Sequence, residues 1–145
     1  MKKYFVLILL IITVGLSSSS CKKAAESPRV EAPGWQMDAT GKYPYTMTAV
    51  VTFPGKLSVH IKSGDQLGAF IGGECRGIGS LQVVGDNPVY FVLIHGQAAE
   101  QQPVEFRYYS SFSSSIYYSD SNLIFSVDSN FGIADDPEVL VLKKQ

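Results

Sequence analysis

The residues that could do chemistry are few in this chain of 145 residues. Its two cysteines are Cys21 and Cys75, and its two histidines are His60 and His95. No HExxH, His-x-His or paired-cysteine spacing occurs, so neither a transition-metal site nor any other cofactor is predicted. No G-x-S-x-G turn accompanies the histidines, and we expect Cys75 to be a buried small hydrophobe. An enzyme is therefore the function class that the sequence favours least.

One pair of charged residues has two interpretations. Asp65 and Arg76 have the same strand parity on the two arms of a predicted hairpin, so a diagonal contact is within the reach of an arginine. The structural interpretation is an ion pair that fixes the hairpin against a loop. The functional interpretation is that Arg76 presents its planar guanidinium to an anionic or sugar ligand.

A stretch rich in tyrosine and serine, residues 106–118 (FRYYSSFSSSIYY), is the most suggestive surface of the chain. Tyrosine rings give contact area at low entropic cost, and serine hydroxyls add adaptable hydrogen bonds. Strand parity places Phe106 and Tyr108 inward and leaves several of the other aromatic rings exposed. The candidate binding residues are Tyr109, Phe112, Tyr117 and Tyr118, of which we expect one of the last two to be exposed. The alternative is that tyrosine merely suits half-buried strands.

Three late segments carry acidic and amide side chains, at residues 120–122, 128–130 and 135–136. Their oxygens could bind calcium, but the glycine and the terminal glutamate of an EF-hand loop are missing. Asp, Asn and Ser also form turns by hydrogen bonding to their own backbone. We expect ordinary turns here, with calcium as the alternative.

The N-terminus has the three parts of a secretion signal. Lys2 and Lys3 precede an apolar run at residues 4–16, and a serine-rich segment ends at Cys21. Thirteen residues in a helix span about 20 Å, short of the ~30 Å hydrocarbon core of a bilayer, so a permanent transmembrane helix is not expected. The cysteine resembles that of a bacterial lipoprotein signal, in which it is acylated and becomes the first residue. We predict a signal peptide at residues 1–20 and lipidation at Cys21.

Cleavage before Cys21 changes the composition of the chain. The remaining 125 residues hold ten Lys and Arg against thirteen Asp and Glu, a net charge of −3, which disfavours a nucleic-acid partner. Residues 21–33 contain two prolines and no aromatic residue, so they are predicted to be a flexible tether before a single domain at residues 34–145. Cys75 is left without an intramolecular partner. We expect a membrane-anchored protein of the cell envelope, and Lys22-Lys23 behind the lipid mildly favours the outer membrane.

Period-two alternation of apolar residues predicts an all-β domain. It extends over residues 43–53 and again over 57–61, with a type II turn at Pro54-Gly55. A two-residue hairpin there would put the two apolar faces on opposite sides of one sheet, so either a bulge intervenes or the chain crosses to a second sheet. Of these we expect the crossing. Residues 89–94 are apolar at both parities, which predicts a central strand covered on both faces. The other predicted strands lie at residues 104–108, 116–119, 123–127 and 139–142.

A hairpin is predicted between residues 67–71 and 74–81. Its connection, Gly72-Gly73, supplies the positive φ angles that a primed turn requires. The register places Phe70 opposite Cys75 and Ala69 opposite Arg76. About nine short strands with regular turn signals predict an antiparallel β-sandwich, immunoglobulin-like or jelly-roll-like.

The hairpin segment also resembles a known family. Residues 65–77 read D-Q-L-G-A-F-I-G-G-E-C-R-G, similar to the Asp-x-Leu-x-Ala-Phe-x-Gly-x-x-Cys-Arg-Gly core of a small β-sandwich module in secreted and lipid-anchored envelope proteins of Gram-negative bacteria. Flanking elements of that pattern are Trp35, Met47-Thr48, Phe106-Arg107-Tyr108, Gly132 and Asp136-Pro137. The resemblance implies an extracytoplasmic binding or architectural module without known catalysis.

These observations predict a cell-envelope lipoprotein whose β-sandwich binds a protein or a glycan. Exposed aromatic rings could stack on sugar faces, and free strand edges could accept a strand from a protein. The alternative is a structural accessory subunit of a surface assembly, without a small-molecule ligand.

Overall fold

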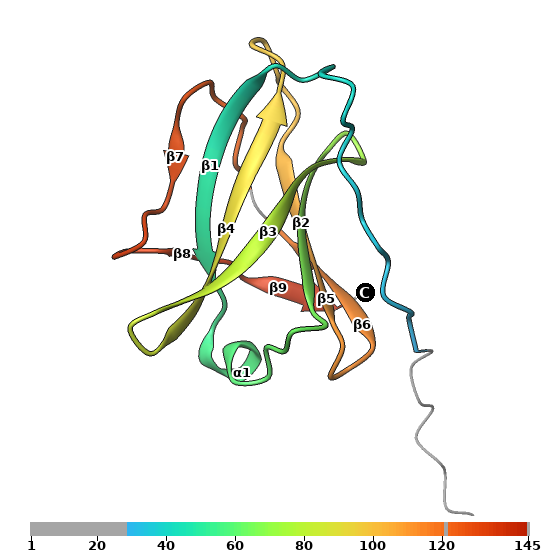
Figure 1. The fold of residues 1–145 in the computed structure, drawn as a ribbon, viewed down its shortest axis with the longest axis vertical. Helices are drawn as coiled ribbons and strands as arrows, with labels where there is room; N and C mark the ends of the chain where they lie inside the picture. Colours follow the sequence, from blue (N-terminus) through green and yellow to red (C-terminus); the bar gives the residue numbers. More distant parts are fainter. Residues whose placement is uncertain (1–28, 121, 145) are drawn as a thin grey trace, which may run out of the picture.

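The structure, a computed structural model, describes residues 29–120 and 122–144, so the predicted signal peptide and Cys21 lie outside the described residues. Within these ranges the chain forms nine strands and one short helix, which confirms the all-β class (Figure 1). The strands are β1 (Tyr45–Thr52), β2 (Gln66–Ile71), β3 (Glu74–Val84), β4 (Asn87–Gly96), β5 (Val104–Ser110), β6 (Ser115–Ser119), β7 (Asn130–Phe131), β8 (Glu138–Val139) and β9 (Leu142–Lys144). The helix, α1, spans Gly55–Ser58.

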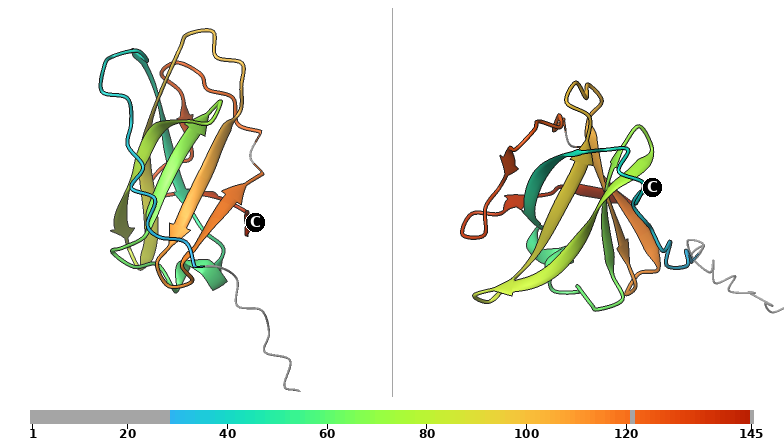
Figure 2. Two further views of the ribbon diagram at one scale, coloured as in Figure 1. Left: turned by 90° about the vertical axis from the view of Figure 1, so that its right-hand side faces the viewer. Right: turned by 45° about the horizontal axis from the view of Figure 1, so that its top comes forward.

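The strands form one curled, mostly antiparallel sheet. Its order is β7-β1-β4-β3-β2-β5-β6-β9, and β8 also pairs with β1. The long strand β3 links two wings, because its first half pairs with β2 and its second half with β4. The curl brings the wing of β1 and β4 over the wing of β2, β5 and β6 (Figure 2). The two layers of the predicted sandwich are thus parts of one half-barrel.

The C-terminal strands bridge the gap between the two wings. β8 runs parallel to β1, whereas β9, two residues further on, pairs with β6. Between them Leu140 is buried in the core, and its N–H donates to the carbonyl of Thr52 at 2.9 Å. The prediction of a single strand at residues 139–142 is therefore wrong, because each half of this segment pairs with a different wing.

The core lies between the wings and is made by alternate residues of the strands. Phe106 and Tyr108 point inward, as strand parity predicted, and both are fully buried. The other large, fully buried side chains are Leu67, Ile71, Val89, Tyr90, Val92, Ile94, Val51 and Val104.

The predicted hairpin of β2 and β3 is confirmed, with one change of register. Gly72 and Gly73 have φ angles of 59° and 83°, the left-handed values that the turn requires of glycine. Phe70 pairs with Cys75 as expected. Ala69 pairs with Gly77 instead of Arg76, because a bulge between Ala69 and Phe70 shifts the pairing.

The predicted strand at residues 57–61 is wrong. The backbone N–H groups of Leu57 and Ser58 both turn back to the carbonyl of Pro54, which starts α1. Leu57 and Ile61 pack against the core, while Val59 is 74% exposed. Apolar residues four positions apart fit a helical turn as well as a strand, so the alternation did not distinguish them. The expected crossing does occur, because β1 and β2 lie in different wings.

Two further expectations about strands are wrong. Residues 123–127 form no strand, and pair only through an isolated bridge between Ile124 and Pro103, although Phe125 does enter the core. β4 is central in the sheet, but it is not covered on both faces, because Leu93 is 49% exposed.

Candidate functional site

The tyrosine-rich hairpin of β5 and β6 is less exposed than the sequence predicts. Tyr109 is buried, which overturns its expected exposure, whereas Tyr117 and Tyr118 are half-buried. Tyr117 packs against Tyr108 of the core, with ring centroids 6.2 Å apart. Phe112, at 57% exposure, is the candidate binding residue that the structure leaves most open.

The N-terminal segment explains why the outer face of this wing is covered. The N–H of Val30 donates to the carbonyl of Ser114 at 2.8 Å, and the Trp35 ring meets the Phe70 ring edge-on at 5.3 Å. Between these two points the segment runs beside β2, β5 and β6 (Figure 1). Tyr109 has the outward parity on β5, because its neighbour Tyr108 enters the core. Residues 29–33, the end of the predicted tether, are therefore joined to the domain.

Tyr118 belongs to a stack of rings on the same outer face. The Arg107 guanidinium lies over the Phe70 ring at 4.1 Å and over the Tyr118 ring at 5.6 Å, and it pairs with Glu105. These are structural contacts within the wing. The stack leaves Tyr118 a packing role, which is the alternative that the sequence left open.

Phe112 forms an exposed surface together with the segment that contains α1. We define the tip as Lys56, Val59, His60, Lys62 and Phe112. The rings of His60 and Phe112 are parallel within 1°, with centroids 4.3 Å apart, and Nζ of Lys62 lies 5.2 Å from the Phe112 centroid. The sequence does not predict most of the tip, because its period-two alternation indicates a strand at residues 57–61. The spacing of Leu57 and Ile61 is the signal that could have indicated a turn.

Asp65 fixes the loop beneath the tip. Its carboxylate accepts hydrogen bonds from the hydroxyl of Tyr108 at 2.5 Å, from the N–H and hydroxyl of Ser111 at 2.7 Å each, and from the N–H of Lys62 at 2.8 Å. Burial, followed by this hydrogen bond, raises the pKa of Tyr108, so the phenol stays protonated and donates. The network ties the α1 segment to the β5–β6 turn.

Arg76 lies elsewhere and does not pair with Asp65. Gly68 pairs with Ile78, so Asp65 extends past the other end of the hairpin. The Arg76 guanidinium stacks over the Tyr43 ring at 3.2 Å and lies 3.5 Å from Glu74 and 3.4 Å from Glu100. It is buried, so it does not present its guanidinium to a ligand at the surface.

A second exposed apolar surface lies on the outer side of β3 and β4. We define the β3–β4 face as Ile78, Phe91 and Leu93. Ile78 and Leu93 are exposed and Phe91 is half-buried. Ser80 pairs with Phe91 and Gly79 with Val92, so the register brings Ile78 opposite Leu93. The apolar run at residues 89–94 was the signal for this face, but both parities were assigned to the core.

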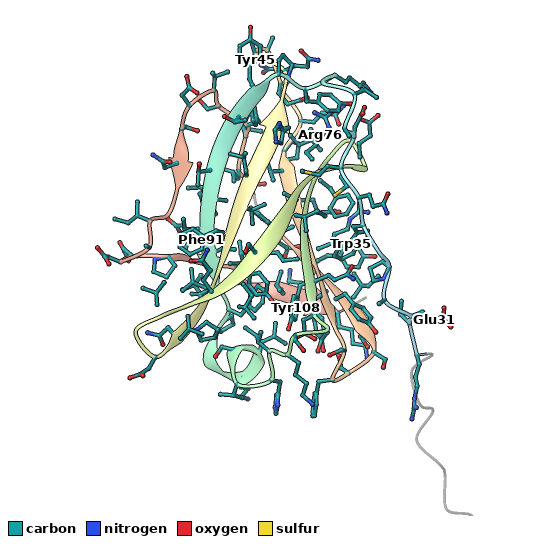
Figure 3. All side chains as sticks on the ribbon, in the orientation of Figure 1. Glu31, Trp35, Tyr45, Arg76, Phe91 and Tyr108 are labelled. Carbon is teal, nitrogen blue, oxygen red and sulfur yellow. The ribbon has the colours of Figure 1, made fainter. Side chains whose placement is uncertain are left out.

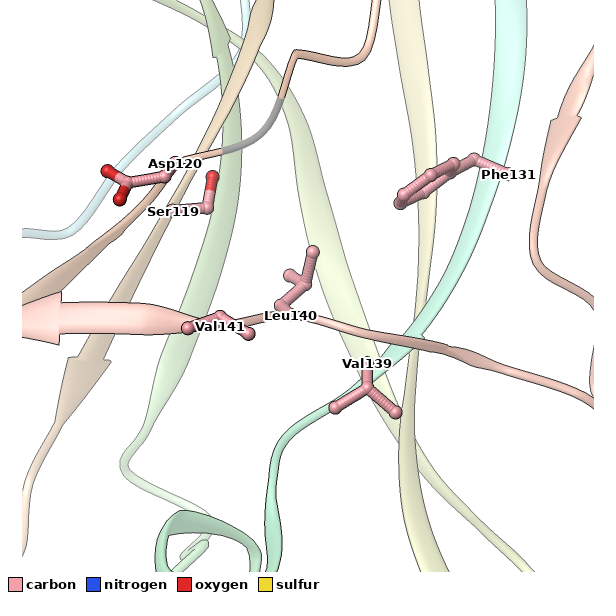
Figure 4. A pocket seen from close by; sticks show the side chains of 6 residues that line it. All are labelled: Ser119, Asp120, Phe131, Val139, Leu140 and Val141. Atoms are coloured by element: carbon pink, nitrogen blue, oxygen red, sulfur yellow. The ribbon is translucent and has the colours of Figure 1, made fainter.

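Two hollows flank the C-terminal bridge. One, of about 220 Å³, is lined by Ser119, Asp120, Phe131, Val139, Leu140 and Val141 (Figure 4). The other, of about 390 Å³, is lined by Thr52, Phe53, Gly55, Ser58, Asn87, Pro88, Pro137 and Val139. The sole ionisable side chain in either lining, Asp120, is bonded to Lys143. Neither lining therefore offers an acid–base pair.

The remaining candidates for chemistry are separated from one another. Cys75 is half-buried, which is less than predicted. Burial raises the pKa of its thiol, whereas a reactive cysteine needs a lowered pKa. His60 belongs to the tip, whereas Nδ1 of His95 lies 3.3 Å from the carbonyl of Tyr43. Among residues 29–120 and 122–144, no three metal-ligating side chains cluster. The same ranges contain no helix that is long and apolar enough to cross a membrane.

The fold and these surfaces define an all-β domain whose exposed apolar areas include the tip and the β3–β4 face. No family model matches the chain, and neither a curated protein nor a solved structure shows significant similarity to it.

Proposed function

We propose that the protein is a cell-envelope lipoprotein, acylated at Cys21 and held on the outer membrane, whose all-β domain binds a protein partner without catalysis. The lysine, apolar and serine-cysteine pattern of residues 1–21 supports the anchor. The observation that carries the binding role is the exposed β3–β4 face.

The contrast between the two wings supports a partner on this face. The outer face of the β2, β5 and β6 wing is covered by the chain's own N-terminal segment, with Trp35 packed on Phe70. On the other wing, Ile78 and Leu93 are left in solvent beside Phe91. Contiguous exposed apolar residues mark interaction sites more often than chance exposure does. Small-molecule sites are mostly concave pockets, whereas this surface is the outer face of a sheet, which suits a protein partner better.

The anchor is tested by replacing its acceptor. Cys21→Ala should abolish the acyl mass of the mature protein and release it from the membrane fraction. A variant that stays in the membrane fraction would refute lipid anchoring.

The binding face is tested by a photo-crosslinking residue at Leu93 in intact cells, with one at Val141 as the control. Val141 is also an exposed apolar residue but lies in the C-terminal bridge. A crosslinked protein specific to the Leu93 position would then be purified and titrated. Leu93→Asp should weaken that complex at least about tenfold, or roughly 1.4 kcal/mol, while Val141→Asp should not. Equal affinities for both variants would exclude the β3–β4 face.

A further inference from the structure

We propose that the tip is a membrane-docking surface that binds anionic phospholipid headgroups and thereby orients the anchored domain. This inference rests on the acylation of Cys21 proposed above. It assigns the tip a role separate from that of the β3–β4 face.

The tip combines the side chains that suit a membrane interface. Val59 is 74% exposed and Phe112 is 57% exposed, so the tip holds two apolar side chains in solvent. Lys56 and Lys62 flank them, and neither lysine forms an ion pair within the described residues. Apolar side chains that enter the headgroup region beside unpaired lysines are typical of proteins that rest on anionic membranes.

The tip is held rigid, which makes it a preformed surface. Asp65 ties the N–H of Lys62 to Ser111, next to Phe112. His60 stacks in parallel on the Phe112 ring. Little conformational entropy is therefore lost when the tip contacts a membrane.

The chain leads toward the anchor from the same end of the domain. Val30 is bonded to Ser114, two residues from Phe112, and the β5–β6 turn and α1 lie together at this end (Figure 1). Tyr45 lies at the opposite end, and Glu31 near the first (Figure 3).

The reach of the chain favours this end over the other. Nine Cα steps separate Cys21 from Val30, so they lie at most about 32 Å apart. The ten residues of β4, nine Cα steps, span about 30 Å. For the opposite end of the domain to touch the membrane, nearly the whole reach of a fully extended tether would therefore be needed. An acylated Cys21 can thus bring the tip to the membrane surface, while the Tyr45 end stays about one strand length further out.

The experiment uses the full-length acylated protein in vesicles of phosphatidylethanolamine and phosphatidylglycerol, with or without brominated acyl chains. Phe112→Trp places a fluorophore in the tip, and Tyr45→Trp, at a side chain of 42% exposure, is the matched control at the opposite end. The wild-type protein, whose single tryptophan is Trp35, gives the background emission that is subtracted from both variants. Brominated lipid should quench the emission of Trp at position 112 by about half, as expected for a ring 5–10 Å into the interface, and leave that at position 45 unchanged.

The role of charge is tested in the same vesicles. Replacing Lys56 and Lys62 by Gln, or replacing phosphatidylglycerol by phosphatidylcholine, should abolish the quenching at position 112. The control replaces Lys143 and Lys144, on β9, by Gln, and the quenching at position 112 should persist in this variant. Unfolding midpoints in urea show whether each variant keeps its fold.

Three results would overturn the proposal. An intact mass without acyl chains would refute the anchor and the orientation with it. Acylated protein with equal quenching at positions 112 and 45, or with none, would refute docking by the tip and leave the anchor standing. A position-112 signal that responds to soluble glycan or to a protein, and not to brominated lipid, would assign the tip to that ligand.

Discussion

Replacing Asp65 by Ala should destabilise the domain by about 2–4 kcal/mol. The largest part comes from the hydroxyl of Tyr108, which is buried and would lose its acceptor, at a cost of about 1–3 kcal/mol. The donors on Ser111 and Lys62 lie nearer the surface, where water replaces much of each bond, so together they add about 1 kcal/mol. Urea unfolding at pH 7, followed by circular dichroism, measures the change as a lower midpoint with an unchanged slope.

A pair of tyrosines supplies the control for this prediction. Tyr108→Phe removes the donor to Asp65 and should cost about 1–2 kcal/mol. Tyr90→Phe removes an equally buried hydroxyl that has no protein hydrogen-bond partner within the described residues, and should change stability by less than about 0.5 kcal/mol. The Asp65→Ala/Tyr108→Phe double variant should cost about 1 kcal/mol less than the two single changes together. Additive costs, or a Tyr90→Phe cost equal to that of Tyr108→Phe, would show that the network is misassigned.

Three other changes probe the pH dependence, the covered wing and the buried arginine. Burial raises the pKa of Tyr90 and Tyr108, so at high pH the folded state keeps protons that the unfolded state loses. The two tyrosines should therefore lower the free energy of unfolding above about pH 10, by up to ~2.7 kcal/mol per pH unit together, and urea titrations of Tyr90→Phe should show about half of that contribution missing. Gly68→Ala would place a Cβ 2.8 Å from the Phe70 ring and 3.1 Å from the Trp35 ring, so it should lower the free energy of unfolding by about 1–3 kcal/mol. The displaced Trp35 should then emit at longer wavelength. Unchanged emission would show that the N-terminal segment is not packed against β2 at Gly68. Arg76→Ala should cost about 3–5 kcal/mol in urea unfolding, because it leaves Glu100, whose side chain is 14% exposed, without its buried cationic partner. A cost below about 1 kcal/mol would contradict a structural role.

The sequence predicts the strands well where the pairing is local. The β2–β3 hairpin depends on Gly72-Gly73 and on alternation within six residues on either side, so its turn and its Phe70–Cys75 pair could be derived. The bulge between Ala69 and Phe70 could not be derived, because the local alternation contains no feature that marks it. Period two also misled at Leu57 and Ile61, since a single helical turn places the same two residues on the core.

The candidate site was predicted less well, because exposure depends on contacts between distant segments. Parity placed Tyr109 outward, and it does lie on the outer side of β5. A segment more than seventy positions earlier in the chain passes over the same wing and is fixed there by the bond from Val30 to Ser114. Composition indicated a disordered tether there. Nothing in the local pattern of either segment specifies that the two meet.

The same N-terminal segment determines which surfaces remain for partners. It crosses the wing of β2 and β5 and ends at the tip, so the chain covers one sheet face with its own residues. An acyl group on Cys21 would hold the start of the mature chain at the membrane. The β3–β4 face is then covered by another molecule or stays in solvent. Docking of the tip would hold the β3–β4 face at a fixed orientation to the membrane. Loss of tip docking should therefore reduce capture of a partner in the same membrane more than capture of a soluble one.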